Sequence, residues 1–227
     1  MSADAREAVL ARVRSALATP GTPRARADGP PATGAGLAVP TDRAEILDLF
    51  ALRVVDYRAV VDRVLEGDLG AAVARALATH GATSAVAPTG LDPGWFEPAR
   101  AAGVTVSSQD EVTHDRRPDA AALDAVVGVV TTADVGIAVT GTIVLAHGPG
   151  QGPRALTLVP DLHVCVVRAD QVVADVPEAT ERLADSVRAG RPLTWISGPS
   201  ATSDIELERV EGVHGPRTLH VLIVDAE

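Results

Sequence analysis

Residues 69–87 read LGAAVARALATHGATSAVA, and this stretch decides the fold class. Its first part, Leu69–Thr79, carries small and apolar residues at the spacing of a helix that is buried along one side. Gly81 is expected to end that helix in the left-handed conformation, which glycine adopts without strain. Ser84–Ala87 is a short apolar run typical of a buried strand. The stretch therefore predicts a helix, a tight turn and a strand in quick succession.

The same alternation continues on both sides of this stretch. Upstream, Thr41 is expected to cap a helix, and an extended segment is expected near Val54–Val61. Downstream, a helix around Trp95–Ala101 leads to a strand at Val104–Val106. Short connections of this kind are typical of an α/β fold with a mostly parallel sheet. Aromatic residues make up only 2% of the chain, so aliphatic side chains must fill the core, which favours strands buried on both faces.

The C-terminal half is predicted to hold further strands around two glycine-containing turns. Two β-rich runs, Val135–Val139 and Thr142–Leu145, are separated by Thr140 and Gly141, which indicates a hairpin or a sharp bend. A loop rich in glycine and proline follows, and it matches neither a dinucleotide fingerprint nor a P-loop. The remaining expected elements are strands at His163–Val167, Leu193–Ser197 and Thr218–Val224, and a helix from Pro177 to Arg188.

The N-terminal region differs in composition from the rest of the chain. A helix is expected at Ala3–Leu17, and residues 18–40 read as a linker because they carry five prolines and four glycines. The chain is therefore divided into residues 1–40, a helix on a linker, and residues 41–227, an α/β domain. The apolar stripe of the helix is expected to dock on its own domain or on a second copy, giving a homo-oligomer, with an unrelated partner as the alternative.

Composition excludes several classes of function. The net charge of −10 makes nucleic acid an unfavourable partner, and no apolar stretch could span a membrane or form a signal core. A cytoplasmic location is expected. One cysteine, Cys165, excludes an internal disulfide and a self-contained iron–sulfur cluster. All 20 basic residues are arginine, which excludes lysine Schiff-base chemistry and leaves arginine, backbone N–H groups and hydroxyls to bind an anion.

The sharpest local feature is the run WISGPSATSDIE at residues 195–206. A strand is expected to enter a Gly-Pro turn, and a hydroxyl-rich run then opens a short predicted helix. Ser200, Thr202 and Asp204 are candidate anion ligands, because the N–H groups at a helix start bind anions at the carboxyl end of a strand. Glu206 is a candidate proton carrier. The alternative is plain helix capping without a ligand.

Two further segments supply candidate site residues. In GVHGPR, residues 212–217, Arg217 can pair with an anion and His214 can act as a general acid or base, or serve only a structural role. In the segment around residues 134–142, Asp134 is a candidate catalytic carboxylate. The same segment offers candidate ligand residues through close backbone approach or hydroxyl groups: Gly136, Thr140, Gly141 and Thr142. The alternative is that these glycines only shape a bend.

Metal and hydrolase chemistry are not indicated. Asp161 and His163 share a strand face, but no recognised metal spacing is present, so no metal site is predicted. The chain also lacks a G-x-S-x-G nucleophile elbow. Cys165 lies inside an apolar run and is expected to be a buried core residue.

Four stretches together resemble the lactate-utilisation protein C (LutC/YkgG) family, which carries the LUD domain. They are residues 136–145, 158–163, 197–206 and 212–217. The resemblance implies a three-layer α/β/α fold similar to ribose-5-phosphate isomerases and CoA transferases. It also implies a role in oxidising L-lactate to pyruvate beside partner proteins, with iron–sulfur clusters in those partners and no cofactor in this chain. The sequence departs from the family at Val139, where a glutamate is frequent.

Three functions are compatible with these observations. The first is an accessory subunit of a lactate-oxidising system that binds a small anion, iron–sulfur partners or both. The second is a free-standing enzyme on a phosphosugar-, CoA- or folate-type anion, with Ser200, Thr202 and Arg217 holding the anion and Asp134 or Glu206 moving protons. The third is an interaction module that acts through the N-terminal helix.

Overall fold

The computed structural model describes residues 3–18, 39–114, 117–203, 209–211 and 214–225. The chain divides into two compact units, Met1–Leu37 and Ala38–Glu227. In the first unit, helix α1 spans Ala3–Ala18, close to the predicted range. The second unit contains all the described strands and all the residues of the site considered below.

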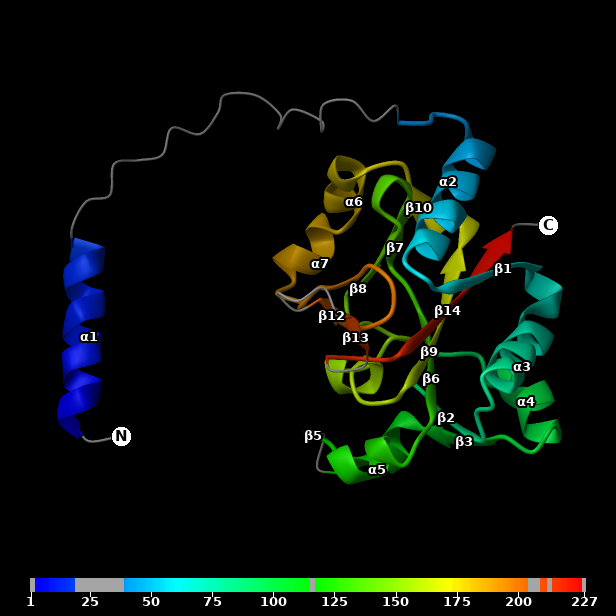
Figure 1. Cartoon of the computed structure of the whole chain (residues 1–227), viewed down its shortest axis with the longest axis horizontal. Coiled ribbons are helices and arrows are strands. Elements are labelled where there is room, and N and C mark those ends of the chain that lie inside the picture. The colour runs from blue at the N-terminus through cyan, green and yellow to red at the C-terminus, as the bar shows by residue number, and fades with distance from the viewer. Residues whose placement is uncertain (1–2, 19–38, 115–116, 204–208, 212–213, 226–227) are drawn as a thin grey trace. The chain divides into compact units, whose positions relative to one another are not determined.

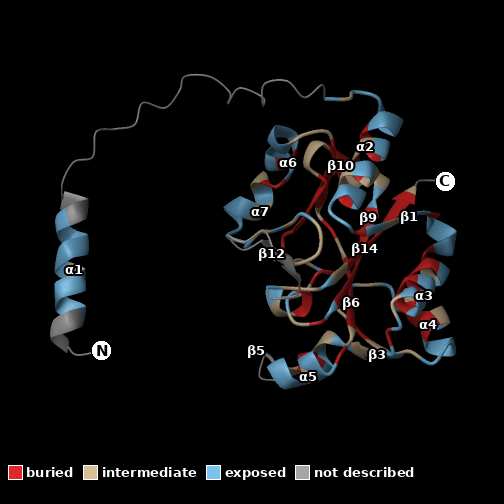
Figure 2. Ribbon diagram, in the orientation of Figure 1, coloured by how far each residue is buried: buried red, intermediate tan, exposed pale blue. Residues whose placement is uncertain are grey.

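Six parallel strands form the central sheet of the second unit (Figure 1). In spatial order they are β1 (Val60–Leu65), β14 (Thr218–Asp225), β9 (Leu162–Arg168), β6 (Gly128–Thr132), β2 (Ser84–Ala87) and β3 (Thr105–Ser108). Every neighbouring pair in this sheet is parallel. The central strands are buried on both faces, as Figure 2 shows for β6 and β14, which is typical of a parallel sheet covered on two sides.

A smaller mixed sheet packs beside the central one. Its order is β10 (Val172–Val173), β7 (Val135–Ile137), β8 (Thr142–Leu145) and β11 (Thr194–Ile196). β10 runs parallel to β7, and the other pairs are antiparallel. Two short two-stranded ladders complete the described strands: β4 (Thr113–His114) with β5 (Arg117–Pro118), and β12 (Ala201–Ser203) with β13 (Arg209–Glu211).

Helices cover both faces of the central sheet. α3 (Leu69–Thr79) and α4 (Glu97–Ala101) share an apolar cluster with one face of β9 and β14. On the opposite face, α2 (Arg43–Asp56) and the inner side of the small sheet enclose a second cluster. α5 (Ala120–Asp124) packs near β6, and α6 (Val176–Arg182) covers the outer side of the small sheet and leads into α7 (Ala184–Arg188).

Much of this architecture was predictable. The mostly parallel α/β fold is confirmed, as are α3, β2, the left-handed turn at Gly81 (φ 64°) and the β7–β8 hairpin. The likeness to isomerases and CoA transferases stays a prediction.

Three predictions were wrong in detail. Asp42, rather than Thr41, caps α2, because its carboxylate accepts from the N–H groups of the first turn. The expected extended segment begins late, because α2 continues to Asp56 and the strand starts at Val60. The hydroxyl-rich run after Ser200 opens strand β12 instead of a helix, because it pairs with β13.

Candidate functional site

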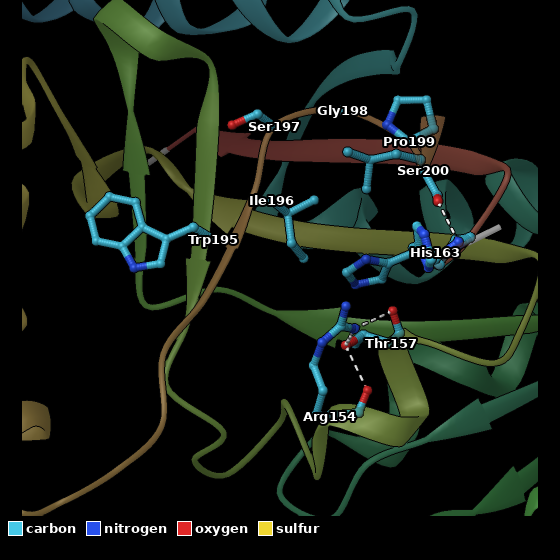
Figure 3. A pocket seen from close by; sticks show the side chains of 13 residues that line it. Arg154, Thr157, His163, Trp195, Ile196, Ser197, Gly198, Pro199 and Ser200 are labelled. Carbon is cyan, nitrogen blue, oxygen red and sulfur yellow. Dashed lines mark hydrogen bonds between the residues drawn. The ribbon is translucent and has the colours of Figure 1, made fainter. Parts of the chain in front are cut away.

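A cavity of about 250 Å³ lies where three distant segments of the second unit meet (Figure 3). The first segment runs from Arg154, at the end of the glycine-rich loop (residues 147–154), to the start of β9. The second leaves β11, and the third leads into β14. Both polar and apolar groups line the hollow: Arg154, Thr157, His163, Trp195, Ile196, Ser197, Gly198, Pro199, Ser200, His214, Gly215, Pro216 and Leu219. Because it joins two of the motifs singled out in the sequence, this cavity is the candidate site.

The cavity lies at the amino ends of two central strands. His163 and Leu219 are the second residues of β9 and β14, and their register pairs them directly. The Gly-Pro turn does follow the carboxyl end of a strand, but that strand is β11 of the small sheet. The expected location at the carboxyl ends of the parallel sheet was therefore wrong for this turn.

Arg154 supplies the positive charge of the cavity. It begins a 3-10 turn at Arg154–Thr157, and its Nη1 donates to the carbonyl oxygen of Thr157 at 2.8 Å and to the hydroxyl at 3.1 Å. Partial burial lowers the pKa of the guanidinium, which still stays charged in water. Among the described residues that line the cavity, no Asp or Glu faces this cation. The arrangement favours an anionic ligand.

His163 forms the buried floor of the cavity. Its side chain is 1% exposed, and its Nε2 lies 2.8 Å from the Thr131 hydroxyl of β6. Burial, and then the nearby charge of Arg154, lower the pKa of His163 to about 3, so the ring is neutral at physiological pH. Behind it, burial raises the pKa of the Cys165 thiol to about 12, which keeps it protonated.

Two predicted motifs meet at the rim. The backbone N–H of Ser200 donates to the carbonyl oxygen of Pro216 at 2.8 Å, and the N–H of His214 donates to the Ser200 hydroxyl at 3.1 Å. Gly198 makes the turn before Ser200 with φ 83°, and a Cβ there would lie 2.5 Å from the Cβ of Tyr57. The structure thus brings Ser200 and His214, from two of the motifs singled out in the sequence, together at the rim.

The remaining wall is apolar. Trp195 and Ile196 come from β11, and Leu219 comes from β14. Trp195 is 45% exposed although it is a large aromatic side chain. In Figure 3 its indole projects from one side of β11, and Ile196 projects from the other side, toward His163. The cavity therefore offers one cation, several hydroxyl and backbone groups, and an apolar side.

A wider and more open groove of about 940 Å³ adjoins the glycine-rich loop. It is lined by residues that follow β2 and β3, among them Thr89 and Gln109, and Arg154 lines both this groove and the cavity. Asp134, which directly precedes β7, accepts from the Ala146 N–H and from Gln151 Nε2 of the glycine-rich loop, each at 2.8 Å. This predicted catalytic carboxylate holds the loop and does not line the cavity.

Two glycines predicted from the β7–β8 hairpin, Gly136 and Gly141, lie close against α2. A Cβ on Gly136 would lie 3.0 Å from the ring of Phe50, and one on Gly141 (φ 58°) would lie 2.7 Å from the backbone of Arg53. The Thr140 hydroxyl is buried without a partner among the described residues, and it does not line the cavity. Close backbone approach is present, as predicted, but a helix occupies the space.

Thr142 and Val139 have different neighbours. The Thr142 hydroxyl lies 2.8 Å from that of Ser197, so it supports the cavity wall from behind. Val139 packs against the apolar cluster of the small sheet, at the position where the LUD resemblance led us to expect a glutamate.

The predicted cation Arg217 does not line the cavity. Its Nε lies 3.5 Å from Asp161 Oδ1, and both side chains are about two-thirds exposed. Thr202 belongs to β12. Asp204 and Glu206 lie outside the described residues. The roles assigned to these four residues stay predictions.

Sequence reasoning missed Arg154, His163 and Trp195 as site residues. The motifs mark Arg154 only as the end of a loop, and they mark His163 only as a possible metal ligand. For Arg154 one signal was available, because arginine is the only permanently cationic side chain in this lysine-free sequence and Arg154 lies at the end of the glycine-rich loop. For His163 the sequence gives no such signal, because His220 also lies in an apolar strand. Trp195 reaches this cavity through the pairing of β11 with β8, which the local sequence does not encode.

The sequence pattern of the LUD domain matches residues 32–224. This chain belongs to the LUD-domain family. The LUD-domain protein is 48% identical over 186 residues to lactate utilization protein C of Deinococcus radiodurans, covering 82% of each chain. It is 35% identical over 101 residues to lactate utilization protein C of Halalkalibacterium halodurans, covering 42% of this chain and 44% of the relative. The family resemblance seen in the sequence is confirmed.

A solved structure supports the same grouping for this LUD-domain protein. The crystal structure of a DUF162 family protein from Deinococcus radiodurans matches with a TM-score of 0.68 and 40% sequence identity. The match covers 82% of this chain and 99% of that one. Among the described residues of the LUD-domain protein, no helix is both long and apolar enough to cross a membrane.

Proposed function

We propose that this LUD-domain protein serves in lactate utilisation as an accessory subunit, and that it binds a small carboxylate anion in the cavity around Arg154. The relative that is 48% identical carries the name lactate utilization protein C. The observation that carries the binding step is the charge of the lining: Arg154 is its one permanently charged side chain among the described residues.

The electrostatics of the cavity favour an anion. The whole chain carries a net charge of −10, so its overall field repels anions. The guanidinium of Arg154 provides positive charge locally, in the lining of the cavity. Arg154 Nη1 is bonded to Thr157, while Nε and Nη2 have no hydrogen-bond partner among the described residues. Two free donors in one plane match the two oxygens of a carboxylate.

The size of the cavity favours a small acid. A cavity of about 250 Å³ lies below the usual range for drug-sized ligands, roughly 300–1,000 Å³. CoA and folate are larger than such ligands, so this cavity supports the free-standing-enzyme alternative less well. A short carboxylate can place its charge at Arg154 and its alkyl end against Ile196 or Leu219.

The cavity also supports an accessory role. His163 is held neutral, Cys165 is held as a thiol, and no carboxylate lines the cavity among the described residues. Of the predicted catalytic residues, His214 is the one that lines the cavity among the described residues, and its backbone N–H is bonded to Ser200. Binding and presenting a small acid are therefore better supported than transforming it. We propose that electron transfer takes place on iron–sulfur partner proteins.

Tryptophan fluorescence tests the binding step directly. The chain has two tryptophans, Trp95 and Trp195, and only Trp195 lines the cavity. In a Trp95→Phe background we expect L-lactate to change the fluorescence of Trp195 in a saturable way. Arg154→Gln should weaken binding at least about ten-fold, whereas Arg188→Gln, at an exposed ion pair on α7, should not.

Two results would count against the proposal. Absence of saturable binding for L-lactate and pyruvate, with binding of a sugar phosphate or CoA instead, would favour the enzyme alternative. Turnover of lactate by the purified chain with an artificial electron acceptor alone would contradict the accessory role. We expect turnover only when iron–sulfur partners are added.

A further inference from the structure

The floor of the cavity contains a buried ring with one nitrogen that has no partner among the described residues. His163 is 1% exposed, and its Nε2 is engaged by the Thr131 hydroxyl at 2.8 Å, which leaves Nδ1 unpaired. The fully buried unpaired side-chain atoms among the described residues are Arg53 Nε and Thr140 Oγ1, so His163 Nδ1 is not sealed in the core. The ring lines the cavity, so Nδ1 is available to a molecule bound there.

His163 also differs from a typical anion ligand. It is neutral at physiological pH, so it adds no charge to the site and contributes only hydrogen bonding. Arg154 is the one permanently charged side chain among the described lining residues, so it meets the charge of the ligand. A ligand that satisfies both groups carries an anionic end and, close to it, an uncharged oxygen.

The Thr131 hydroxyl lets the ring present either form of Nδ1. The hydroxyl can accept from Nε2–H while pointing its own proton toward Cys165 Sγ, 3.8 Å away, and Nδ1 is then an acceptor. Alternatively the hydroxyl donates to Nε2, and Nδ1 then carries the proton and is a donor. Both arrangements keep the ring neutral and leave Nε2 paired.

We infer that the cavity is specific for carboxylates with an oxygen on the neighbouring carbon, in which Arg154 holds the carboxylate and His163 Nδ1 pairs with that oxygen. A 2-hydroxy acid donates its hydroxyl proton to the acceptor form of Nδ1, and a 2-oxo acid accepts from the donor form. The site thereby accommodates both oxidation levels of one acid without a change of charge. This inference rests on the proposed function and names the class of ligand for the same cavity.

A panel of three acids of equal charge tests the inference on the full chain. L-lactate, pyruvate and propionate differ at the second carbon, where propionate has no oxygen. With Trp195 as the reporter in the Trp95→Phe background, we expect propionate to bind at least about five-fold more weakly than the other two, because it leaves Nδ1 unpaired. A water molecule that fills the gap would instead make all three bind alike.

The His163→Phe variant, which keeps a planar ring without nitrogen, supplies the matched comparison. It should bring the three acids to similar affinity while Trp195 still responds. Since the residue is buried in a central strand, ring ¹⁵N spectra of the unsubstituted protein provide a second measurement. We expect Nδ1 of His163 to be unprotonated with L-lactate and protonated with pyruvate.

The outcomes separate the two proposals. Equal binding of the three acids that depends on Arg154 would retain the anion site and overturn the role of His163. No binding of any acid would overturn the proposed function itself. The same His163 tautomer in both complexes would overturn the exchange between the two forms.

Discussion

His163 shows how a single residue can couple the cavity to stability. Its pKa in the folded chain is about 3, against 6.5 for a free imidazole. The depressed pKa means that the folded state binds the proton less well than the unfolded state. Its contribution to stability is therefore complete above about pH 6.5 and is lost progressively as the pH falls toward 3.

The size of this effect can be measured. Between pH 7 and pH 5 the His163 contribution should fall by about 2 kcal/mol, from the linkage between pKa and unfolding free energy. The free energy of unfolding in urea should be measured at both pH values for the natural chain and for His163→Phe. The other histidines are present in both proteins, so the difference between their pH dependences is due to His163. An identical pH dependence in the two proteins would show that His163 is protonated as easily folded as unfolded.

Two glycines with similar backbone angles offer a second test at the residue scale. Gly141 (φ 58°) and Gly81 (φ 64°) both adopt the left-handed conformation, but only at Gly141 would an added Cβ meet a neighbour, the backbone of Arg53 at 2.7 Å. Gly81→Ala should cost about 1–2 kcal/mol for backbone strain alone. Gly141→Ala should cost roughly 2–5 kcal/mol, because overpacking is added. Equal losses in urea unfolding would contradict the close contact with α2.

At the scale of elements, the sequence predicted those helices and strands whose structure is determined by residues close together in the chain. α3 and β2 lie next to each other in the chain, and their helical pattern, glycine stop and apolar run were readable. β6 (Gly128–Thr132) was missed because it is short and its strand structure depends on pairing with β9 and β2, which are distant in sequence. β12 was mistaken for a helix for the same reason.

The candidate site follows the same logic. Ser200 and His214 were predicted because each belongs to a motif with an obvious turn, and the structure joins them at the rim. Arg154 and His163 were missed because neither belongs to a motif that indicates a ligand, although both line the cavity. Arg217 was preferred over Arg154 because of its motif, and its position beside Asp161 could not be read from sequence.

A histidine pair links three elements and gives a prediction at this scale. His80 at the end of α3 lies 3.1 Å from His220 of β14, and His220 Nε2 lies 3.0 Å from Asp62 Oδ2 of β1. The ring nitrogens between the two histidines can share one proton but cannot both carry one. Burial and then the charge of His220 lower the pKa of His80, so this link is stable above about pH 6.5 and weakens as the pH falls.

Amide hydrogen exchange can measure the weakening of the contact between His80 and His220 at the end of α3. Between pH 7 and pH 5, after correction for the intrinsic rate, amides in the last turn of α3 should lose protection faster than those of α2. His80→Gln should remove this excess loss, because glutamine does not titrate and keeps a donor near His220. Equal loss of protection in both helices of the unsubstituted chain would argue against the link.

At the scale of the molecule, the cavity belongs entirely to the unit Ala38–Glu227. Every lining residue lies between positions 154 and 219, and the apolar clusters beneath them are formed within the same unit. Binding of a small acid should therefore stabilise this unit as a whole. At a ligand concentration about 100 times Kd, linkage gives about 2.7 kcal/mol, or roughly 5–10 °C in Tm for a domain of this size.

Removing residues 1–37 separates the role of the N-terminal helix from that of the cavity. α1 exposes Val9 and Val13, and the apolar stripe led us to predict association of copies through this helix. We expect the fragment 38–227 to keep the L-lactate-induced rise in Tm and the response of Trp195, since no cavity residue is lost. Its mass by light scattering should fall from that of an oligomer to that of a monomer. An unchanged oligomer would place the association surface on the α/β unit, and a lost Tm response would show that the helix contributes to ligand binding.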